Sequence, residues 1–314
     1  MRILITGGAG FIAYHLAARL QDEHYEVYLL DNFNHFYDPA LKRRNVRDLQ
    51  ARGDARLYEI DILDAERLRR AFAEIRPQAV VHLAAWAGVR PSLENPEIYA
   101  GVNVTGTVNL LQLARDFQVS SFLFGSSSSV YGGNERVPFS EDDPVDRPIS
   151  PYAATKRAGE LLCHTYAFHY SMNITCLRFF TVYGPRQRPE MAIHKFAQLI
   201  HDGQEIPVYG DGESRRDYTY VDDITAGIVA ALRVNPRFEI INLGESRTTT
   251  LLALIAELEN ALGEKARRRF LPDQPGDMKI TYADISKARR ILGYQPTTPI
   301  EEGIRKFAGW FLQK

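Results

Sequence analysis

The sequence predicts an α/β fold in which helices cover both faces of a doubly wound parallel sheet. Short runs rich in β-branched and aromatic residues alternate with helical patterns from the start of the chain. These runs are almost continuously apolar, as expected of strands that are buried on both faces. Such alternation is typical of parallel sheets, because the chain returns across the sheet through a helix after each strand. The 314 residues suffice for one large or two modest domains.

Strands are expected at six β-rich runs before residue 181. In chain order they are residues 2–6, 26–31, 56–61, 79–84, 121–127 and 174–180. Loops rich in proline and glycine follow, and one further run, 239–242, is expected to rejoin the sheet. We therefore assign residues 1–180 and about 217–244 to the sheet domain. Residues 181–216 and 245–314 are expected to form a smaller lobe over the carboxyl ends of the strands, where ligands of open α/β sheets bind.

The composition favours a globular protein and excludes several functional classes. Hydrophobic residues make up 45% and charged residues 25%, with a formal net charge of -1, so neither disorder nor general nucleic-acid binding is indicated. No apolar stretch approaches the roughly 20 residues of a membrane span, and the N-terminus reads as a strand rather than a signal peptide. The two cysteines lie in apolar segments and the eight histidines show no ligand spacing. These features favour a cytoplasmic protein with reduced thiols and no metal site.

A glycine-rich turn follows the first strand. The segment Gly7-Gly8-Ala9-Gly10-Phe11-Ile12-Ala13 lets the backbone approach a pyrophosphate, whose charge is met by N–H groups at the start of the next helix. Alanine is an accepted variant of the third glycine. A glycine turn alone has conformational explanations. Its place between a strand and a helix indicates a dinucleotide site, with Gly7, Gly10, Phe11 and Ile12 against the cofactor.

An acidic residue closes the second strand, about 20 residues further along the chain. Asp31 is placed to bond the hydroxyls of an adenosine ribose, and its charge would repel a 2′-phosphate, so NAD is favoured over NADP. The alternative is a turn residue at a strand end. Residues at or near the strand ends complete the expected cofactor site: Asn32, Asn34, Asp61, Ile62, Leu83, Ala84 and Ala85.

A tyrosine and a lysine four residues apart open a later helix. Ser150 is a natural N-cap and Pro151 a natural first residue, so Tyr152 and Lys156 share one helical face. We expect the ammonium to lower the pKa of the tyrosine from about 10 and make it a general base near neutral pH. An isolated pair of this kind is more often a surface tyrosine above a solvated lysine.

The context of this pair is a serine run at the end of the fifth strand, Ser126-Ser127-Ser128-Ser129. Together with residues 6–13 and Asp31, these residues resemble the extended short-chain dehydrogenase/reductase family over nearly the whole chain. The resemblance implies a Rossmann sheet that binds NAD, catalysis by Tyr152 and Lys156, and an assisting hydroxyl from Ser127 or, alternatively, Ser128. It also implies that Asn103 supports the cofactor site.

The residue before Val130-Tyr131 bears on the reaction type. Relatives that dehydrate or decarboxylate nucleotide sugars typically carry an acidic residue there, and this chain has Ser129. The resemblance therefore implies 4-epimerisation. NAD oxidises C4 while Tyr152 takes the hydroxyl proton, the 4-keto sugar turns in the pocket, and the hydride returns to the opposite face.

Several segments resemble UDP-glucuronate 4-epimerases in particular, namely residues 31–39, 87–90, 178–185 and 274–277. On this resemblance Arg90 is placed in the substrate site, and UDP-glucuronate is the expected substrate. A uronate needs donors for its carboxylate. Thr181 and Arg188 are the first choices, and Arg186 and the serines are further donors. The alternative is that these arginines bind diphosphate or are solvated.

The nucleotide is expected to bind mainly the smaller lobe. Tyr209 resembles the family's uracil-stacking aromatic and Arg216 its diphosphate-binding arginine, and Asp277 is placed to meet the ribose. Gln274 stands where some hexose epimerases carry an arginine, so other groups must meet the diphosphate charge.

Two rival functions and one question of assembly stay open. A UDP-glucose/UDP-galactose 4-epimerase would use the same catalytic residues, and a non-catalytic NAD-sensing protein would keep only the cofactor site. Helical patterns over 96–117 and 151–170 resemble the helices through which family members form a four-helix bundle, so a homodimer is expected. Burial of these helices against the chain's own sheet is the alternative.

Overall fold

The computed structural model describes residues 1–272 and 278–313, and its centre is a parallel sheet of seven strands. Across the sheet the order is β11-β6-β5-β4-β1-β2-β3. Their bounds are β1 (Arg2–Thr6), β2 (Glu26–Asp31), β3 (Ala55–Glu59), β4 (Ala79–His82), β5 (Ser121–Ser127), β6 (Ile174–Phe179) and β11 (Phe238–Leu243). All neighbouring strands pair in parallel, which confirms the predicted fold class.

Two hydrophobic clusters occupy the two faces of the sheet, because successive side chains of a strand point to opposite sides. In β1, Ile3 and Ile5 join the first cluster and Leu4 the second. The helices that bury residues in the first cluster include α1 (Phe11–Asp22), α2 (Pro39–Arg52) and α9 (Val221–Val234). Those in the second are α3 (Ala65–Ile75), α6 (Gly106–Asp116) and α7 (Pro151–Tyr170). Burial on both faces explains why the strands are almost continuously apolar.

Short helical elements lie at the carboxyl ends of β4 and β5. After β4 come α4 (Val89–Glu94), α5 (Pro96–Tyr99) and a π-helical turn (Ala100–Thr105) that runs directly into α6. A single 3-10 turn (Ser128–Tyr131) follows β5. π-Helical turns are frequent at functional sites, and this one carries Asn103.

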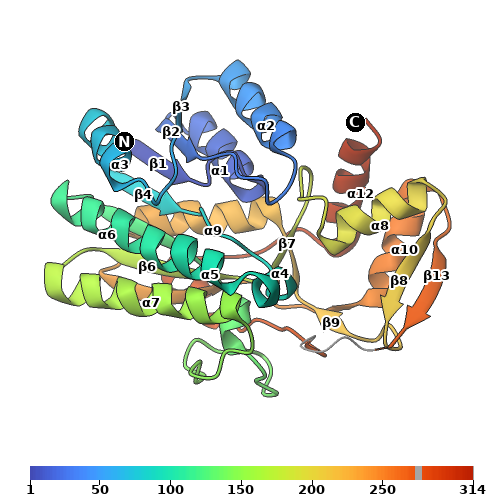
Figure 1. Cartoon of the computed structure of the whole chain (residues 1–314). Coiled ribbons are helices and arrows are strands. Elements are labelled where there is room, and N and C mark those ends of the chain that lie inside the picture. The colour runs from blue at the N-terminus through green and yellow to red at the C-terminus, as the bar shows by residue number, and fades with distance from the viewer. Residues whose placement is uncertain (273–277, 314) are drawn as a thin grey trace.

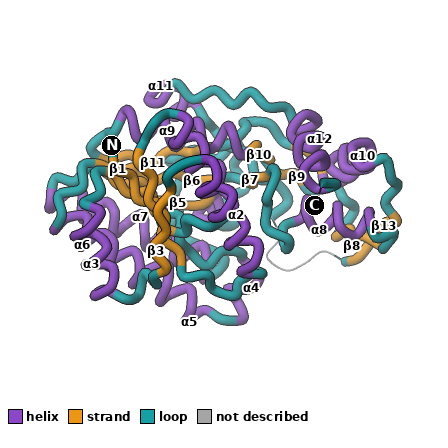
Figure 2. Tube along the Cα trace, turned by 90° about the horizontal axis from the view of Figure 1, so that it is seen from above, coloured by secondary structure: helices purple, strands orange, loops and turns teal. Residues whose placement is uncertain are grey.

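Apart from α9, β11 and residues 286–292, the elements from residue 181 onward lie at one side of the main sheet in both views (Figures 1 and 2). Three small sheets pair β7 (Thr181–Tyr183) with β10 (Tyr218–Tyr220), β8 (Glu205–Tyr209) with β13 (Arg267–Leu271), and β9 (Arg215–Arg216) with β12 (Thr249–Thr250). The helices there are α8 (Ala192–His201), α10 (Leu251–Leu262) and α12 (Ile300–Phe311), while α11 (Ser286–Leu292) packs on α9 and β11. No helix in the described residues is both long and apolar enough to cross a bilayer.

Three strands end before the predicted residue. β6 ends at Phe179, one residue early, whereas β3 ends at Glu59 and β4 at His82, each two residues early. Residues 61–62 and 83–85 therefore lie beyond their strands. At Asp61 the reason is local, because its Oδ1 accepts a hydrogen bond from Leu63 N at 2.8 Å. A side chain that bonds the backbone two residues on forms a turn and competes with strand pairing.

Candidate active site

A cavity of about 370 Å³ runs from the glycine turn, past the ends of β2, β4 and β5, to β7. The glycine turn forms one wall because its backbone lies unusually close to β4. Gly7 has a φ of +65°, and a Cβ atom there would lie 2.8 Å from Ala84 N. No side chain caps α1 at Gly10, so the first N–H groups of α1 have no intrahelical acceptor. The turn and helix therefore offer backbone donors to an anion.

Most of the predicted cofactor residues line this cavity. They are Gly7, Gly10, Phe11, Ile12, Asp31, Asn32, Asn34, Ile62, Leu83, Ala84, Ala85, Tyr152 and Lys156. Asp61 and Asn103 are not among the lining residues but contact the site indirectly. Asp61 Oδ2 accepts a hydrogen bond from Asn32 Nδ2 at 2.8 Å. Asn103 Oδ1 accepts a hydrogen bond from Trp86 N, and Asn103 Nδ2 donates to Trp86 O. The same Nδ2 donates to Thr155 Oγ1 at 3.0 Å.

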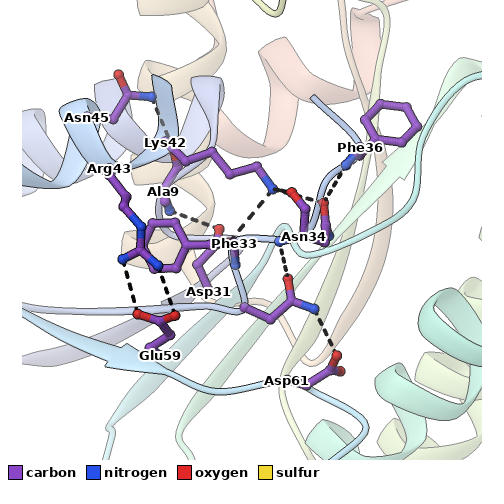
Figure 3. Close-up of polar contacts among 11 residues, drawn as sticks. Ala9, Asp31, Phe33, Asn34, Phe36, Lys42, Arg43, Asn45, Glu59 and Asp61 are labelled. Carbon is purple, nitrogen blue, oxygen red and sulfur yellow. Dashed lines mark hydrogen bonds and ion pairs between the residues drawn. The ribbon is translucent and has the colours of Figure 1, made fainter. Parts of the chain in front are cut away.

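Asp31 is buried at the end of β2 and is held by backbone donors on both carboxylate oxygens (Figure 3). Its Oδ2 accepts from Ala9 N at 3.2 Å and its Oδ1 from Phe33 N at 2.8 Å. A carboxylate with two further lone-pair sites can still accept from ribose hydroxyls. Its position at the cavity wall fits the role that the sequence predicts.

Lys42 is a residue of this region that the sequence analysis missed. It is 4% exposed, lines the cavity, and its Nζ lies 4.0 Å from Asp31 Oδ1. The ammonium donates to the carbonyl and side-chain oxygens of Asn34 at 3.0 and 2.9 Å (Figure 3). Burial lowers the pKa of Lys42, and the Asp31 carboxylate opposes that shift. No motif surrounds Lys42 in the sequence, and the fold of residues 32–38 is what brings it to Asp31.

Tyr152 and Lys156 line the cavity together, and the N-terminus of α7 is built as predicted. Ser150 Oγ accepts a hydrogen bond from Ala153 N at 3.1 Å, and Pro151 opens the helix. Lys156 Nζ donates to Gly125 O on β5 at 2.7 Å. Burial lowers the pKa of Lys156 to about 8.

The prediction that Lys156 lowers the pKa of Tyr152 is wrong for this structure. Burial raises the pKa of Tyr152, and the Ser127 hydroxyl and the Arg188 charge oppose the rise only in part. Lys156 is not among the groups that shift the pKa of Tyr152, and its ammonium donates to the Gly125 carbonyl. Helical spacing placed the two residues on one face, but it did not determine where the long lysine side chain ends.

All four serines of residues 126–129, at the end of β5 and in the turn after it, line the cavity. Their hydroxyl groups have different partners. Ser126 Oγ donates to Glu160 Oε1 on α7 at 2.7 Å, whereas Ser127 Oγ lies 3.0 Å from Ser129 Oγ. Ser127 is the serine hydroxyl that acts on the pKa of Tyr152.

The two predicted carboxylate donors lie in the same cavity as Tyr152. Thr181 opens β7, and Arg188 follows β7 in the loop before α8. Arg188 Nε lies 3.0 Å from Glu190 Oε1, and its guanidinium carbon lies 5.3 Å from the ring centre of Phe36. Glu190 and Phe36 were not singled out from the sequence. The Arg186 guanidinium instead binds Asn45 and Asp48, so it is not a donor in the cavity.

Three of the predicted nucleotide residues, Arg90, Tyr209 and Arg216, are not among the residues that line this cavity. Arg90 and Tyr209 contact each other, with the guanidinium carbon 5.2 Å from the ring centre, although 118 residues separate them in the chain. Arg216 lies on β9, and its Nη1 donates to Arg215 O at 2.9 Å. Gln274 and Asp277 fall outside the described residues. Among the described residues, no three His, Cys, Asp or Glu side chains are grouped as metal ligands would be.

Comparison with known proteins agrees with this geometry. The chain is 44% identical over 308 residues to a UDP-glucuronate 4-epimerase of Thermodesulfobacterium geofontis, covering 98% of this chain and 95% of the relative. It superposes with a TM-score of 0.92, at 38% identity, on a Bacillus cereus UDP-glucuronic acid 4-epimerase solved with UDP-glucuronic acid and NAD, covering 100% and 99% of the two chains. A Thermus thermophilus UDP-glucose 4-epimerase solved with NAD gives 0.90 at 32% identity, with 99% of each chain covered.

The sequence also matches the model of a protein family. The model of the NAD dependent epimerase/dehydratase family matches residues 3–244, a span that includes the glycine turn, Asp31, the serine run and Tyr152. It follows that the chain belongs to the NAD dependent epimerase/dehydratase family.

Proposed function

We propose that this protein is an NAD-dependent UDP-sugar 4-epimerase that interconverts UDP-glucuronate and UDP-galacturonate. The observation that carries the proposal is the single cavity in which Asp31, Tyr152 and Arg188 all have a place. NAD and a UDP-sugar bound together in this cavity would therefore meet a dinucleotide site, a proton-transfer residue and a cation for the carboxylate. Relatives named as UDP-glucuronate 4-epimerases match over nearly the whole chain.

The residues present at the glycine turn fit NAD. Gly7 and Gly10 let the turn pack closely, since a Cβ atom would lie 2.8 Å from Ala84 N at Gly7 and 3.0 Å from Gly7 O at Gly10. The first N–H groups of α1 would meet the charge of a pyrophosphate bound at this turn. Asp31 would bind the adenosine ribose, and the cavity wall at Ile62, Ala84 and Ala85 is apolar. When bound, NAD would accept the hydride from C4 of the sugar and return it later in the cycle.

Tyr152 is the residue that moves the proton. It takes the proton of the C4 hydroxyl as the 4-keto sugar forms and gives it back after the sugar has turned. Ser127 or Ser128 holds the same oxygen by a hydrogen bond, since both hydroxyls line the cavity. Because its pKa is raised in the protein without ligands, Tyr152 is suited to protonate the product and needs nearby positive charge to act as a base.

Thr181 and Arg188 would hold the uronate carboxylate. A 4-keto uronate is a β-keto acid and loses carbon dioxide when its carboxylate bond lies parallel to the carbonyl π system. Donors that fix the carboxylate in another orientation suppress this loss. Arg188 is suited to the task because its guanidinium presents a rigid fork of donors, and Glu190 and Phe36 hold it from two sides.

The UDP group would bind the part of the protein formed by residues 181–216 and 245–314, beside a cofactor domain of residues 1–180 and about 217–244. Tyr209 would stack on the uracil, Arg216 and Arg90 would meet the diphosphate, and Asp277 would meet the ribose. Support for this arrangement is the contact of Arg90, on α4, with Tyr209, at the end of β8. The contact brings one residue from each of the two parts of the chain together.

The protein would form a homodimer through α6 and α7. These two helices pack on the same face of the sheet (Figure 1), and the outer side of α7 exposes Leu161 (53%) and Phe168 (70%). Two copies of the pair would make a four-helix bundle and bury these side chains. Replacing both residues with aspartate should shift the protein from dimer to monomer in analytical ultracentrifugation. A wild-type protein that sediments as a monomer would contradict the dimer.

We also propose a cytoplasmic location. Cys163 and Cys176 are both buried and free of disulfide bonds, as expected in a reducing compartment.

Product analysis tests the proposed function. Purified protein is incubated separately with UDP-glucuronate, UDP-glucose and UDP-xylose, and the anomeric proton signals are followed by NMR. We expect UDP-galacturonate from the first and little change in the other two. Tyr152→Phe should lower the rate by about 10²–10⁴-fold while UDP-sugar binding persists. Conversion of UDP-glucose alone would replace the proposal with a hexose epimerase, and activity retained in Tyr152→Phe would remove its mechanism.

A further inference from the structure

Arg186 has a backbone conformation that a bulky residue rarely adopts. Its φ is +66°, in the left-handed region that glycine and asparagine tolerate best. The residue lies in the loop between β7 and α8, two positions before Arg188. A strained backbone conformation persists only when the surrounding contacts hold it. The contacts of Arg186 therefore show how this loop is fixed.

The Arg186 side chain is anchored on the cofactor side of the molecule by three contacts. Nη1 donates to Asn45 Oδ1 at 2.8 Å and Nη2 to Asp48 Oδ2 at 2.6 Å, both on α2. The guanidinium carbon also lies 3.9 Å from the ring centre of Tyr14 on α1. With only 16% of the side chain exposed, solvent screens these contacts less than it screens a surface ion pair.

Asn45 extends this contact to the glycine turn. While its Oδ1 accepts from Arg186, its Nδ2 donates to Ala9 O at 3.0 Å, and Figure 3 shows this second bond beside Asp31. The loop that carries Arg188 is therefore connected through Asn45 to the glycine turn, whose Gly7 and Gly10 line the cofactor site.

The neighbours of Arg186 are anchored as well. Pro185 O accepts from His15 Nε2 on α1 at 2.9 Å. The buried Gln187 donates to Val182 O at 3.1 Å and accepts from His194 N at 3.2 Å. Residues 185–187 are thus held on α1, α2, β7 and α8, and Arg188 is the next residue to enter the cavity.

We propose that Arg186 is a positioning residue that fixes the backbone before Arg188 and thereby sets the preference for a uronate over a neutral hexose. This inference rests on the proposed function. It assigns Arg186 no contact with substrate, and its effect passes entirely through the Arg188 guanidinium. A neutral hydroxymethyl group does not need that guanidinium, so only carboxylate-bearing ligands should respond to the loss of Arg186.

Calorimetric binding in the presence of NAD tests this selectivity. Arg186→Asn removes the anchored guanidinium and keeps a residue that tolerates positive φ. We expect the Kd for UDP-glucuronate to rise on the order of tenfold and that for UDP-glucose to change less than about twofold. The matched control is Arg47→Asn, which removes the same charge from an exposed position of α2 and should change neither Kd. An equal loss for both sugars would overturn the inference.

A double-mutant cycle separates positioning from general destabilisation. In an Arg188→Met background, Arg186→Asn should cost no further uronate affinity, because its route of action is already absent. A further loss of similar size would show that Arg186 acts independently of Arg188 and would overturn the inference. If Arg186→Asn does not fold, Asp48→Asn removes one partner of the guanidinium and should give a smaller uronate-selective loss. An equal rise in both Kd values in Asp48→Asn would also overturn the inference.

The proposed function fails by a different observation. Its failure would appear as wild-type protein that does not convert UDP-glucuronate, in an assay that involves no variant. The binding comparison between UDP-glucuronate and UDP-glucose does not require turnover. Failure of the proposed activity can therefore be distinguished from failure of the inference on Arg186.

Discussion

Lys156 shows how a single buried charge is placed for function at a cost in stability. It is 5% exposed, and its ammonium has one hydrogen bond to Gly125 O and a ring contact with Phe124. Burial of a cation without a close carboxylate partner is unfavourable, and the lowered pKa of Lys156, about 8, expresses the same cost. Residues retained despite such a cost are commonly functional.

Replacing this lysine should therefore stabilise the cofactor-free protein. We expect Lys156→Met to raise the free energy of unfolding by about 3 kcal/mol at pH 7, while epimerisation is lost. Between the folded pKa of about 8 and the unfolded value near 10.5, the unfolded wild-type chain binds a proton that the folded one lacks, so wild-type stability rises with pH. The advantage of the variant should narrow across that range.

Urea unfolding at pH 7 and pH 9.5 measures this difference. The control is Lys306→Met, since Lys306 is 46% exposed in a surface pair with Glu302 and its loss should change stability by less than about 0.5 kcal/mol. A pH-independent difference between wild type and Lys156→Met would contradict the assigned cause.

Among the elements, α7 carries much of the site on one face and is fixed to the sheet by a buried ion pair. Tyr152, Lys156 and Glu160 follow at intervals of four residues. Glu160 accepts from Nε and Nη2 of Arg178 on β6 at 2.8 and 2.9 Å, and both side chains are at most 1% exposed. Glu160 also accepts from Ser126, so this carboxylate ties α7 to β5 and β6 directly beside the serine run.

Removing one charge of this pair should be strongly destabilising. Glu160→Gln leaves the Arg178 guanidinium buried without its counter-ion, and we expect a loss of about 3 kcal/mol. Arg157→Gln is the matched control, because Arg157 contacts the same carboxylate from a more exposed position and should cost less than about 1 kcal/mol. Equal losses in chemical denaturation would show that the buried pair has no special weight.

The elements also show what the sequence could and could not predict. Continuous apolar runs and the Ser150 cap located the strands and the start of α7, because those signals are local. Lys42 carries no local signal, because only the fold of residues 32–38 brings its ammonium to Asp31. Glu190 lies two residues from Arg188, but no motif marks it as the partner of that guanidinium. The error at Tyr152 has the same origin, since i and i+4 spacing states which face two side chains share but not which acceptor a flexible ammonium reaches.

For the molecule as a whole, a ligand that fills the cavity should act as a stabiliser. NAD at 100 times its Kd should stabilise the folded state by about 2.7 kcal/mol. NADP at the same concentration should give a smaller shift in Tm, because Asp31 would face its 2′-phosphate. Asp31→Asn should narrow the difference, since Lys42 at 4.0 Å is then left as the nearer charge. Equal shifts for both dinucleotides in the wild type, measured by scanning calorimetry, would refute the role of Asp31.

The order of the seven strands has a consequence for synthesis on the ribosome. β1, β2 and β3 emerge first and lie at one end of the order, whereas β4, β5, β6 and β11 join successively on the other side of β1. Until residues 238–243 leave the exit tunnel, β6 is the edge strand of the nascent sheet, although it is almost wholly buried in the folded protein. Such an edge recruits other chains, so translation that stalls before residue 238 should yield intermediates that depend on chaperones more than those that already include β11, the half-buried edge strand of the finished sheet.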